Sequence, residues 1–352
     1  SLKQNLDGGA RRVKSVVKVK IGENHIEYID VDEPIAGTGQ VKIKVSYVGI
    51  CGTDISIRHG HQWCNPPVIL GHEFSGIVEE VGKGVTNFKK GDRVVSETAQ
   101  VICGVCNNCM SGHYLMCDKR LSIGYGTNGA MAEYITVREE IVHHLPKGIS
   151  IMEAALCEPS AVAYHAVFDH VSLQPVHTVA VFGPGTIGQL VAQLAKAAGA
   201  RVILCGTSKD TSRLEIARNL GIETLITDDI DVPQYMANQT QGTGVDFAFD
   251  CSGAAPAINQ ALNSIKRMGT LVQVGLTKPN LGIDYNILPL KEIKIIGTFG
   301  HLYQNWSNAL ELMSLGKLNV TPLITAEYHL SQWEEAFDAA EKLNNIKVLL
   351  YP

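Results

Sequence analysis

Four of the nine cysteines stand in one short segment, VICGVCNNCMSGHYLMC. Two, two and seven residues separate Cys103, Cys106, Cys109 and Cys117. Thiolates at this spacing, on a loop that contains Gly and Asn, can surround one tetrahedral Zn²⁺ at about 2.3 Å per bond. Because sulfur fills all four positions, we expect this zinc to be structural and to leave no place for a substrate. An iron–sulfur cluster and four unpaired thiols are the alternatives.

A second set of metal-ligand types is spread along the chain. Cys51 stands in GICGTD, His72 and Glu73 stand in LGHEFSGIVEEVGKGV, and Glu158 stands in CEPSAV. One thiolate, one imidazole and carboxylates form the mixed ligand set of a catalytic zinc, which keeps one position open for water or substrate. Taken singly, a Cys is usually a small core residue and a His beside a Glu is usually an exposed polar pair. The spacing alone leaves both interpretations open.

The motif GPGTIG follows the apolar run TVAVF and opens a helix-like segment. In such a strand–turn–helix setting, the glycines allow a tight turn, the approach of a pyrophosphate and close packing of helix on strand. The helix N-terminus adds free N–H groups for the phosphates. We therefore expect the residues of this turn to bind a dinucleotide: Gly183, Gly185, Thr186, Ile187 and Gly188.

The end of the next apolar run, RVILC, bears on the choice between NAD and NADP. A carboxylate there would hold the ribose 2′-OH of NAD, but Asp210 comes several residues late. Small hydroxyls near Lys209 and Arg213 suit a 2′-phosphate, so the sequence slightly favours NADP over NAD. The alternative is that Lys209 and Arg213 are ordinary exposed helix residues. The residues at this strand end are Gly206, Thr207, Ser208 and Lys209.

The secondary-structure elements that must position these residues follow two different sequence patterns. At 352 residues the chain is too long for one ordinary core, so two domains are expected. Up to about residue 150, short β-branched runs alternate with Lys, Glu and Gly, the period-two pattern of half-buried strands. From about 161 to 300, near-continuous apolar strands alternate with Gly-rich turns and helices, which predicts a parallel sheet covered on both faces.

The composition limits the classes of partner that we expect this protein to bind. The chain has 30 Lys and Arg against 35 Asp and Glu, with no basic cluster, so nucleic acid is not expected as a partner. Charged residues and Pro184 interrupt the most apolar region before it reaches the ~20 residues of a membrane span, so no membrane association is expected. Without an apolar signal core at the start, the cysteines are interpreted as thiols or metal ligands, and we expect a cytoplasmic protein.

The segment GHEFSGIVEEVGKGV, with CGTD before it and the four-cysteine loop after it, resembles the zinc signature of the medium-chain dehydrogenase/reductase superfamily. The resemblance runs from about Val13 to the C-terminus and is strongest to sorbitol (iditol) dehydrogenase, with threonine and butanediol dehydrogenases nearby. It implies an α/β fold: a GroES-like β-rich catalytic domain at 1–160, to which 301–352 return, and a Rossmann doubly wound parallel sheet at 161–300. It also implies an active site between them and a homodimer or homotetramer.

The same resemblance implies roles for individual residues. Cys51, His72 and Glu73 match the catalytic zinc positions, and Glu158 matches a nearby acid that enters the shell or holds the zinc-bound water. Thr53 matches a hydroxyl that relays the proton toward solvent; a turn residue that caps a helix is the alternative. The residues expected at the nicotinamide end are Val274, Gly275, Leu276, Thr298, Phe299 and Gly300.

These residues together predict a zinc-dependent, NAD(P)-linked oxidoreductase with two zinc ions per chain. It would interconvert a secondary alcohol, such as a polyol, a diol or a related hydroxy compound, and a ketone by hydride transfer. An open zinc site lowers the pKa of a bound hydroxyl, and an alkoxide releases hydride readily. The alternatives are a zinc-free quinone or enone reductase of the same superfamily and a non-enzymatic zinc-containing binding protein.

One departure from the polyol enzymes leaves the substrate open. The polyol and threonine enzymes typically carry His five residues after the zinc cysteine, with an aromatic residue next in the polyol group. This chain has Ser56 and Ile57 there, and His59 is a candidate for the proton path. Trp63 and Tyr125 could line a substrate pocket, although buried packing is the expected role of both.

Overall fold

The computed structural model describes residues 11–277 and 281–352. The chain divides into two compact units. Residues 1–10 of the predicted first domain lie outside the described residues. The first unit contains the described chain up to Glu158, Leu302–Ser314 and Ile324–Pro352, and the second contains Pro159–His301 and Leu315–Leu323.

The C-terminal part of the chain divides differently from the prediction that 301–352 return to the first domain. His301 and Leu315–Leu323 belong to the second unit. Two hydrogen bonds hold this short segment there. The Gln193 side-chain amide donates to the Asn319 carbonyl at 3.1 Å, and the Asn319 N–H donates to the Gln193 side-chain oxygen at 2.8 Å.

The first unit is built on a seven-stranded sheet of order β10-β6-β5-β3-β18-β17, with β9 also paired to β3. Alternate residues of its central strand, such as Val41, Ile43 and Val45, are buried in the core, as the period-two pattern predicts. Smaller sheets combine β2, β1 and β4, and β7 with β8. The strands are β1 (Arg12–Lys18), β2 (Ile26–Asp32), β3 (Gln40–Gly49), β4 (Val68–Ile69), β5 (Glu73–Val81), β6 (Arg93–Ser96), β7 (Ala99–Val101), β8 (Leu121–Ser122), β9 (Tyr134–Arg138), β10 (Val142–His144), β17 (Ile324–His329) and β18 (Lys347–Tyr351).

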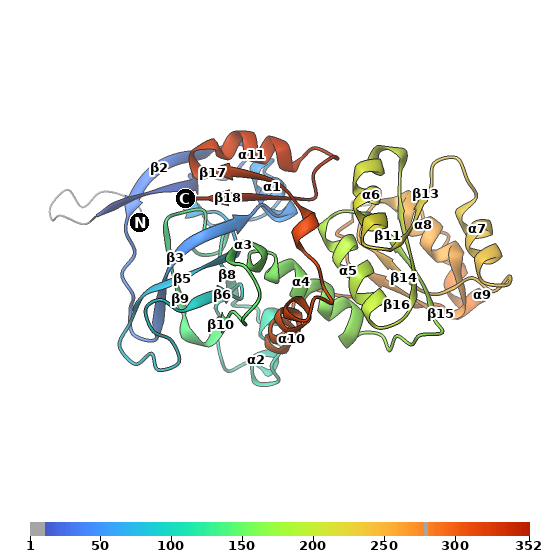
Figure 1. Cartoon of the computed structure of the whole chain (residues 1–352), viewed down its shortest axis with the longest axis horizontal. Coiled ribbons are helices and arrows are strands. Elements are labelled where there is room, and N and C mark those ends of the chain that lie inside the picture. The colour runs from blue at the N-terminus through green and yellow to red at the C-terminus, as the bar shows by residue number, and fades with distance from the viewer. Residues whose placement is uncertain (1–10, 278–280) are drawn as a thin grey trace. The chain divides into compact units, whose positions relative to one another are not determined.

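Short helices connect and cover these strands (Figure 1). Helix α11 packs on β17 and β18 through Ala336, Phe337 and Ala339, which are buried at helical spacing. Helix α3 begins with a capping box, in which Ser150 accepts from the Glu153 N–H and Glu153 accepts from the Ser150 N–H. The helices are α1 (Gly52–Arg58), α2 (Asn107–Met110), α3 (Ile151–Ala154), α10 (Tyr303–Ser314) and α11 (Trp333–Ala340), and α4 (Cys157–Tyr164) begins in this unit and continues into the second.

The second unit is a six-stranded parallel sheet of order β13-β12-β11-β14-β15-β16. Helices α5 and α6 pack against β11, β12 and β13, whereas α7 and α8 pack together and α8 contacts β14 and β15, so helices cover both faces (Figure 1). The strands are β11 (Thr178–Phe182), β12 (Arg201–Gly206), β13 (Glu223–Ile226), β14 (Val245–Asp250), β15 (Ile265–Gln273) and β16 (Lys294–Gly297). The helices are α5 (Thr186–Ala197), α6 (Thr211–Asn219), α7 (Val232–Gln239), α8 (Ala255–Ser264) and α9 (Ile287–Lys291).

This strand order is that of a doubly wound Rossmann sheet. The order reverses between β11 and β14, and ligands of such sheets bind outside the carboxyl ends of the strands at this point. The fold class predicted from the sequence is thus confirmed. Within the described residues, no helix combines the length and apolar character needed to cross a membrane.

Candidate metal centres and cofactor site

The first candidate site begins where β3 passes into α1. Cys51 is the N-cap residue of α1, and the buried Asp54 carboxylate accepts a hydrogen bond from the Cys51 N–H at 2.9 Å. This carboxylate satisfies one of the free N–H groups at the helix start and fixes the backbone of Cys51. Thr53 is half-buried at the second helical position, so it is not the residue that caps the helix.

Strand pairing brings distant ligands to Cys51. Strand β5 starts at Glu73 and runs antiparallel to β3, with Glu73 opposite Gly49, so the start of one strand meets the end of the other. The Cys51 sulfur, an imidazole nitrogen of His72 and a carboxylate oxygen of Glu73 lie within 4.8 Å of one another. His72 and Glu73 are buried. The structure therefore brings three of the four predicted ligands together.

The surroundings of His72 suit a cation. Its Nδ1 lies 3.9 Å from Asp54 Oδ1, and neither buried atom has a hydrogen-bond partner among the described residues. Burial lowers the pKa of His72, but the nearby Cys51 and Asp54 outweigh it and raise the pKa well above its usual value. A histidine that binds metal commonly directs its other ring N–H at a carboxylate. The donor set of sulfur, nitrogen and carboxylate oxygen fits Zn²⁺.

Glu73 already has a cationic partner that sequence reasoning missed. Lys347 Nζ, fully buried on β18, lies 2.5 Å from Glu73 Oε2 and donates to the Ile50 carbonyl at 3.0 Å. A Cβ at Gly49 would lie 2.5 Å from Glu73 Oε2, so only glycine leaves room for this pair. No local motif could have identified Lys347, because 274 residues separate it from Glu73.

Glu158, in the first turn of α4, lies outside the group of three atoms. Its burial raises its pKa to about 7, although His72 pulls the pKa down and Glu73 pushes it up. This electrostatic coupling indicates that Glu158 is a neighbour of the cluster. Sequence reasoning also missed Asp54 as part of the site. Its signal was the spacing C-x-x-D in CGTD, which places a carboxylate at the third helical position, where it can accept from the N–H of the N-cap residue.

The four predicted cysteines of the second site lie together on the loop around α2. All four sulfur atoms are within 4.8 Å of one another, and Cys103 Sγ lies 3.9 Å from Cys109 Sγ. A tetrahedron with bonds of about 2.3 Å separates its sulfurs by about 3.8 Å. Backbone N–H groups of Val105 and Cys106 lower the pKa of Cys103 to about 6. This geometry fits a closed zinc site with Cys106 and Cys117 as the remaining ligands.

The glycines of GPGTIG are required for different physical reasons. Gly183 has a φ of +96°, and a Cβ there would lie 2.8 Å from the Ser252 side chain. A Cβ at Gly188 would collide with the Gly183 carbonyl, so helix and strand pack closely at this point. Gly185 is the N-cap residue of α5, and a Cβ there would meet no protein atom within 4 Å. The open side of the turn is therefore the side available to a pyrophosphate, next to Thr186 and Ile187 in the first helical turn.

The end of β12 carries no free carboxylate. The Asp210 carboxylate accepts from the Thr207 N–H at 2.9 Å and from the Thr207 hydroxyl at 2.8 Å, and it lies 3.6 Å from Arg213 Nη1. Arg213 is thus already paired and mostly buried. The side chains that remain exposed after Gly206 are those of Thr207, Ser208 and Lys209.

The residues expected at the nicotinamide end follow β15 and β16 at the same edge of the sheet. The Val274 and Gly275 N–H groups both donate to the Asp250 carbonyl at 2.9 Å, and the Thr298 N–H donates to the Gln273 carbonyl at 3.1 Å. Leu276 is 85% exposed, and Phe299 and Gly300 follow Thr298 along the chain. Sequence reasoning missed Asp250, whose buried carboxylate accepts from the N–H groups of Ser252 and Gly253; the small residues after it in FDCSG are its only sequence signal.

The positions that depart from the polyol enzymes lie in different surroundings. Ile57 is buried in the core, and the Ser56 carbonyl accepts from the N–H groups of His61 and Gln62. Trp63 is 57% exposed, so its expected burial is wrong. The Tyr125 ring lies edge-on to His72, with 6.2 Å between the ring centroids.

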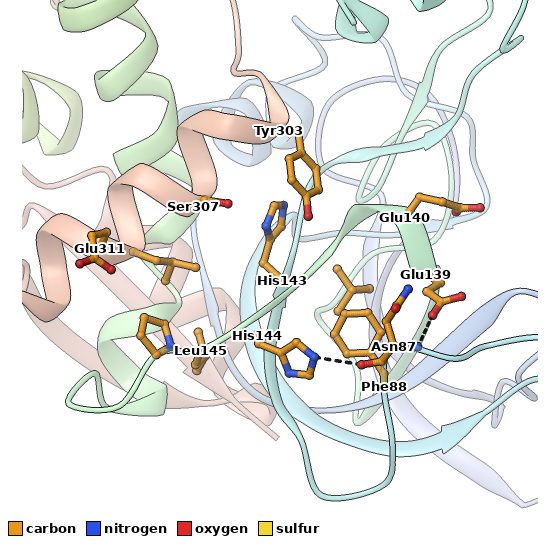
Figure 2. Close-up of a pocket in the computed structure, with 13 residues that line it drawn as sticks. Asn87, Phe88, Glu139, Glu140, His143, His144, Leu145, Tyr303, Ser307 and Glu311 are labelled. Atoms are coloured by element: carbon orange, nitrogen blue, oxygen red, sulfur yellow. Dashed lines mark hydrogen bonds between the residues drawn. The ribbon is translucent and has the colours of Figure 1, made fainter.

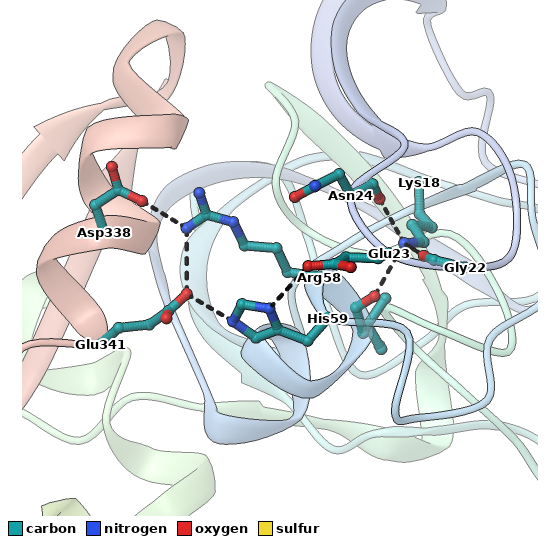
Figure 3. A network of polar contacts seen from close by, with 9 residues as sticks. Lys18, Gly22, Glu23, Asn24, Arg58, His59, Asp338 and Glu341 are labelled. Carbon is teal, nitrogen blue, oxygen red and sulfur yellow. Dashed lines mark hydrogen bonds and ion pairs between the residues drawn. The ribbon is translucent and has the colours of Figure 1, made fainter.

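The C-terminal end of α1 is held by a polar network (Figure 3). His59 Nε2 lies 3.1 Å from Glu341 Oε1, and Arg58 Nη1 lies 2.7 Å from Asp338 Oδ1 and 3.2 Å from the same Glu341 oxygen. The buried Lys18 ammonium donates to the Ile57 carbonyl at 2.9 Å. His59 is therefore engaged about 10 Å along the helix from its N-terminus, which does not favour it as a proton path from Cys51.

Two protein-family profiles match the chain. The profile described as "Alcohol dehydrogenase GroES-like domain" matches residues 37–147, and that described as "Zinc-binding dehydrogenase" matches residues 186–314. The sorbitol dehydrogenase of Halalkalibacterium halodurans is 41% identical, over 97% of this chain and 99% of the relative. The D-arabitol-phosphate dehydrogenase of Enterococcus avium is 40% identical, over 97% and 98% respectively.

Two solved structures are similar to this chain over nearly its whole length. The 2R,3R-butanediol dehydrogenase from Bacillus subtilis is similar with a TM-score of 0.87 and 33% identity, over 97% of this chain and 99% of that chain. A zinc-binding dehydrogenase from Sinorhizobium meliloti bound to NADP has a TM-score of 0.90 and 30% identity, over 97% and 100%.

Proposed function

Because this chain belongs to the zinc-containing alcohol dehydrogenase family, in its polyol dehydrogenase branch, we propose that Cys51, His72 and a neighbouring carboxylate form its catalytic centre. The enzyme interconverts a secondary alcohol and a ketone, with zinc and NAD(P) as cofactors. One observation carries the assignment of the centre. The Cys51 sulfur and a His72 nitrogen converge within 4.8 Å of each other and of a Glu73 carboxylate oxygen, and His72 and Glu73 are buried.

The residues of the proposed centre have different roles. Cys51 and His72 would hold the zinc ion, and Asp54 would orient the His72 ring. Since Lys347 already balances Glu73, we assign Glu158 as the carboxylate beside the zinc-bound water. Thr53 would pass the substrate proton toward solvent. When bound, zinc lowers the pKa of the substrate hydroxyl, and the nicotinamide accepts the hydride.

The substrate and the alternatives are tested by one set of assays. Zinc-loaded protein is assayed with sorbitol, butane-2,3-diol and L-threonine, each with NAD⁺ and with NADP⁺, and metal is counted by mass spectrometry. Oxidation of a polyol or diol with two zinc ions per chain supports the proposal. One zinc per chain, together with reduction of quinones and no alcohol oxidation, would favour the quinone reductase. Two zinc ions without turnover of any substrate would favour a binding protein.

We propose that NADP is the preferred cofactor. The exposed side chains after β12 are two hydroxyls and Lys209. Of the two carboxylates beside them, Asp210 is engaged by Thr207 and Arg213, and Asp228 accepts from the Ser208 N–H. A ribose 2′-phosphate suits the first set, whereas a ribose 2′-OH needs a free carboxylate.

Two substitutions test the cofactor preference. Lys209→Ala should lower kcat/KM for NADP about fivefold, the loss of an exposed charge pair, and leave that for NAD unchanged as the internal control. Gly206→Asp should lower the NADP-to-NAD ratio of kcat/KM at least about tenfold, although its Cβ would lie 2.9 Å from the Pro184 ring and must displace it. An unchanged ratio in both variants would refute the preference.

We propose a homodimer or homotetramer in the cytoplasm. Strand β16 is an edge strand of the six-stranded sheet, and its residues are largely exposed. Such an edge can pair with the same strand of a second copy and extend the sheet. All nine cysteines are free thiols, which suits a reducing compartment. Light scattering after size-exclusion chromatography measures the assembly, and a monomer at micromolar concentration would contradict it.

A further inference from the structure

Carboxylates gather in two surface regions outside the proposed zinc centre. In the first unit, Glu139, Glu140 and Glu311 line a pocket of about 430 Å³ beside β10 and α10 (Figure 2). None of the residues proposed to bind zinc or the dinucleotide lines that pocket. In the second unit, Asp210 and Asp228 follow the carboxyl ends of β12 and β13. Because the dinucleotide is proposed to bind at these strand ends, the second pair of carboxylates bears on cofactor recognition.

Strand pairing holds the ends of β12 and β13 together. The two strands are parallel, with Gly206 opposite Ile226. Just beyond this pair, the Gly206 carbonyl accepts from the Thr227 N–H at 2.9 Å and from the Thr227 hydroxyl at 3.2 Å. Thr227 is buried, whereas Asp228 after it is exposed. The end of β13 therefore delivers Asp228 to the turn that follows β12.

In that turn, Asp228 binds Ser208. Its Oδ2 accepts a hydrogen bond from the Ser208 N–H. Hydrogen bonds from the Ser208 N–H and then from the Ser208 side chain lower the pKa of Asp228, and the nearby charge of Lys209 also lowers it, although burial acts in the other direction. The carboxylate is therefore ionised at neutral pH. Ser208 and Lys209, on which the preference for NADP was argued, thus lie beside a negative charge.

The other carboxylate, Asp210, has a different place in the turn. It is buried and accepts from both the N–H and the hydroxyl of Thr207, as part of the capping box that shapes the turn. Its contacts hold the local backbone, so a change there would alter the fold of the turn. Asp228 is exposed and comes from a neighbouring loop, 20 residues from Ser208 along the chain. Of the two carboxylates, Asp228 is therefore the one whose charge an incoming ligand meets.

A 2′-phosphate and the Asp228 carboxylate need the same partners. A phosphate ester carries nearly two negative charges at neutral pH and binds N–H, hydroxyl and ammonium donors. In this turn, Ser208 supplies the first two kinds of donor and Lys209 the third. Two anions that share these donors repel each other, and the repulsion grows as water is displaced from between them. A ribose 2′-OH carries no charge, so the same carboxylate does not repel it.

We propose that Asp228 is a specificity-determining residue, which weakens the binding of NADP by competing with its 2′-phosphate for Ser208 and thereby limits the preference for NADP. This inference rests on the dinucleotide site proposed above at the end of β12. Lys209 attracts the 2′-phosphate and Asp228 repels it, and the balance of the two sets how far the chain distinguishes NADP from NAD. The determinant on β13 acts in addition to the residues at the end of β12.

Titration calorimetry of the zinc-loaded protein with NADP⁺ and with NAD⁺, in the absence of alcohol, tests the role of Asp228 without turnover. The two ligands differ only in the 2′-phosphate, so the ratio of their Kd values reports on that group alone. Asp228→Asn removes the charge and keeps an acceptor for the Ser208 N–H. We expect it to bind NADP⁺ about threefold to fivefold more tightly, the size of an exposed charge interaction, and NAD⁺ within about twofold of the parent. The gain should shrink at higher salt.

Asp229→Asn is the matched control, because it removes the same charge from the next exposed residue, and it should change the ratio less than about twofold. Both side chains are exposed, so both variants should fold normally, which an unchanged Tm verifies. An unchanged ratio in Asp228→Asn, or an equal gain in Asp229→Asn, would overturn the proposal. Weaker NAD⁺ binding with unchanged NADP⁺ binding would also overturn it, because Asp228 would then bind the ribose hydroxyl. The ratio in the parent tests the preference for NADP, and its change on substitution tests Asp228, so the two proposals can fail separately.

Discussion

The two clusters of metal ligands in the first unit are built in opposite ways. The four-cysteine loop takes all its ligands from one stretch, Cys103 to Cys117, and three of its four cysteines are partly exposed. The cluster of Cys51, His72 and Glu73 is assembled by the pairing of β3 with β5, and most of it is buried. Its charge is balanced by Lys347, from the last strand of the chain. A local site tolerates weak tertiary structure, whereas the buried site depends on the whole sheet.

Cys51→Ser should have the largest effect of any substitution in the two clusters of metal ligands. Loss of the thiolate should remove one zinc ion per chain and lower kcat at least about a thousandfold, or about 4 kcal/mol, because the hydroxyl is no longer activated. Zinc analysis and steady-state rates measure both. Cys64→Ser, at a buried thiol outside both clusters, is the control and should keep two zinc ions and most activity. A Cys51→Ser enzyme with parental activity would remove Cys51 from the catalytic centre.

The next effect concerns the partner of Glu73. Lys347→Met leaves a buried carboxylate without its cation, which should lower the free energy of unfolding by about 3 kcal/mol. Urea unfolding of the zinc-loaded protein measures it. The double variant Lys347→Met, Glu73→Gln should recover much of the loss, because removal of both charges leaves none unpaired. Additive losses in this cycle would show that the two side chains do not interact.

The sequence predicted the parts of the molecule that depend on local spacing. The Cys-x-x-Cys-x-x-Cys run and the GPGTIG turn each have their geometric requirements within a few residues. In the structure the four sulfurs lie close together, and the glycines form a tight turn before α5. The parallel sheet was predictable because both faces are covered, which makes its strands continuous apolar runs.

What the sequence did not predict depends on long-range contact. Lys347 is one lysine among many until β18 carries it to Glu73, and the burial of Lys18 arises in the same way, from three backbone carbonyls at separate points. The return of Leu315–Leu323 to the second unit follows from its pairing with Gln193 on α5. Such contacts have no period or motif, so single-sequence reasoning could not have found them.

Cys106→Ser should have a smaller effect, and on stability more than on chemistry. The variant should lose the loop zinc and lower the unfolding free energy by about 2 kcal/mol, or Tm by about 4–8 °C, because structural zinc binding contributes to folding. Calorimetry and zinc analysis measure the loss, and kcat should stay within about threefold of the parent. If kcat fell as far as in Cys51→Ser, the division between a structural and a catalytic site would be wrong.

The smallest effect is expected where α1 is anchored at the end opposite Cys51. The Glu341 carboxylate contacts both Arg58 and His59, but it is partly exposed, and exposed ion pairs contribute less than about 1 kcal/mol. Glu341→Gln should therefore lower Tm by no more than about 2–4 °C and leave kcat and zinc content unchanged. Arg58 keeps Asp338 as a second partner in this variant, which limits the loss further. A fall in kcat without a loss of stability would mean that His59 takes part in proton transfer, so this substitution also decides whether the polar network is only an anchor.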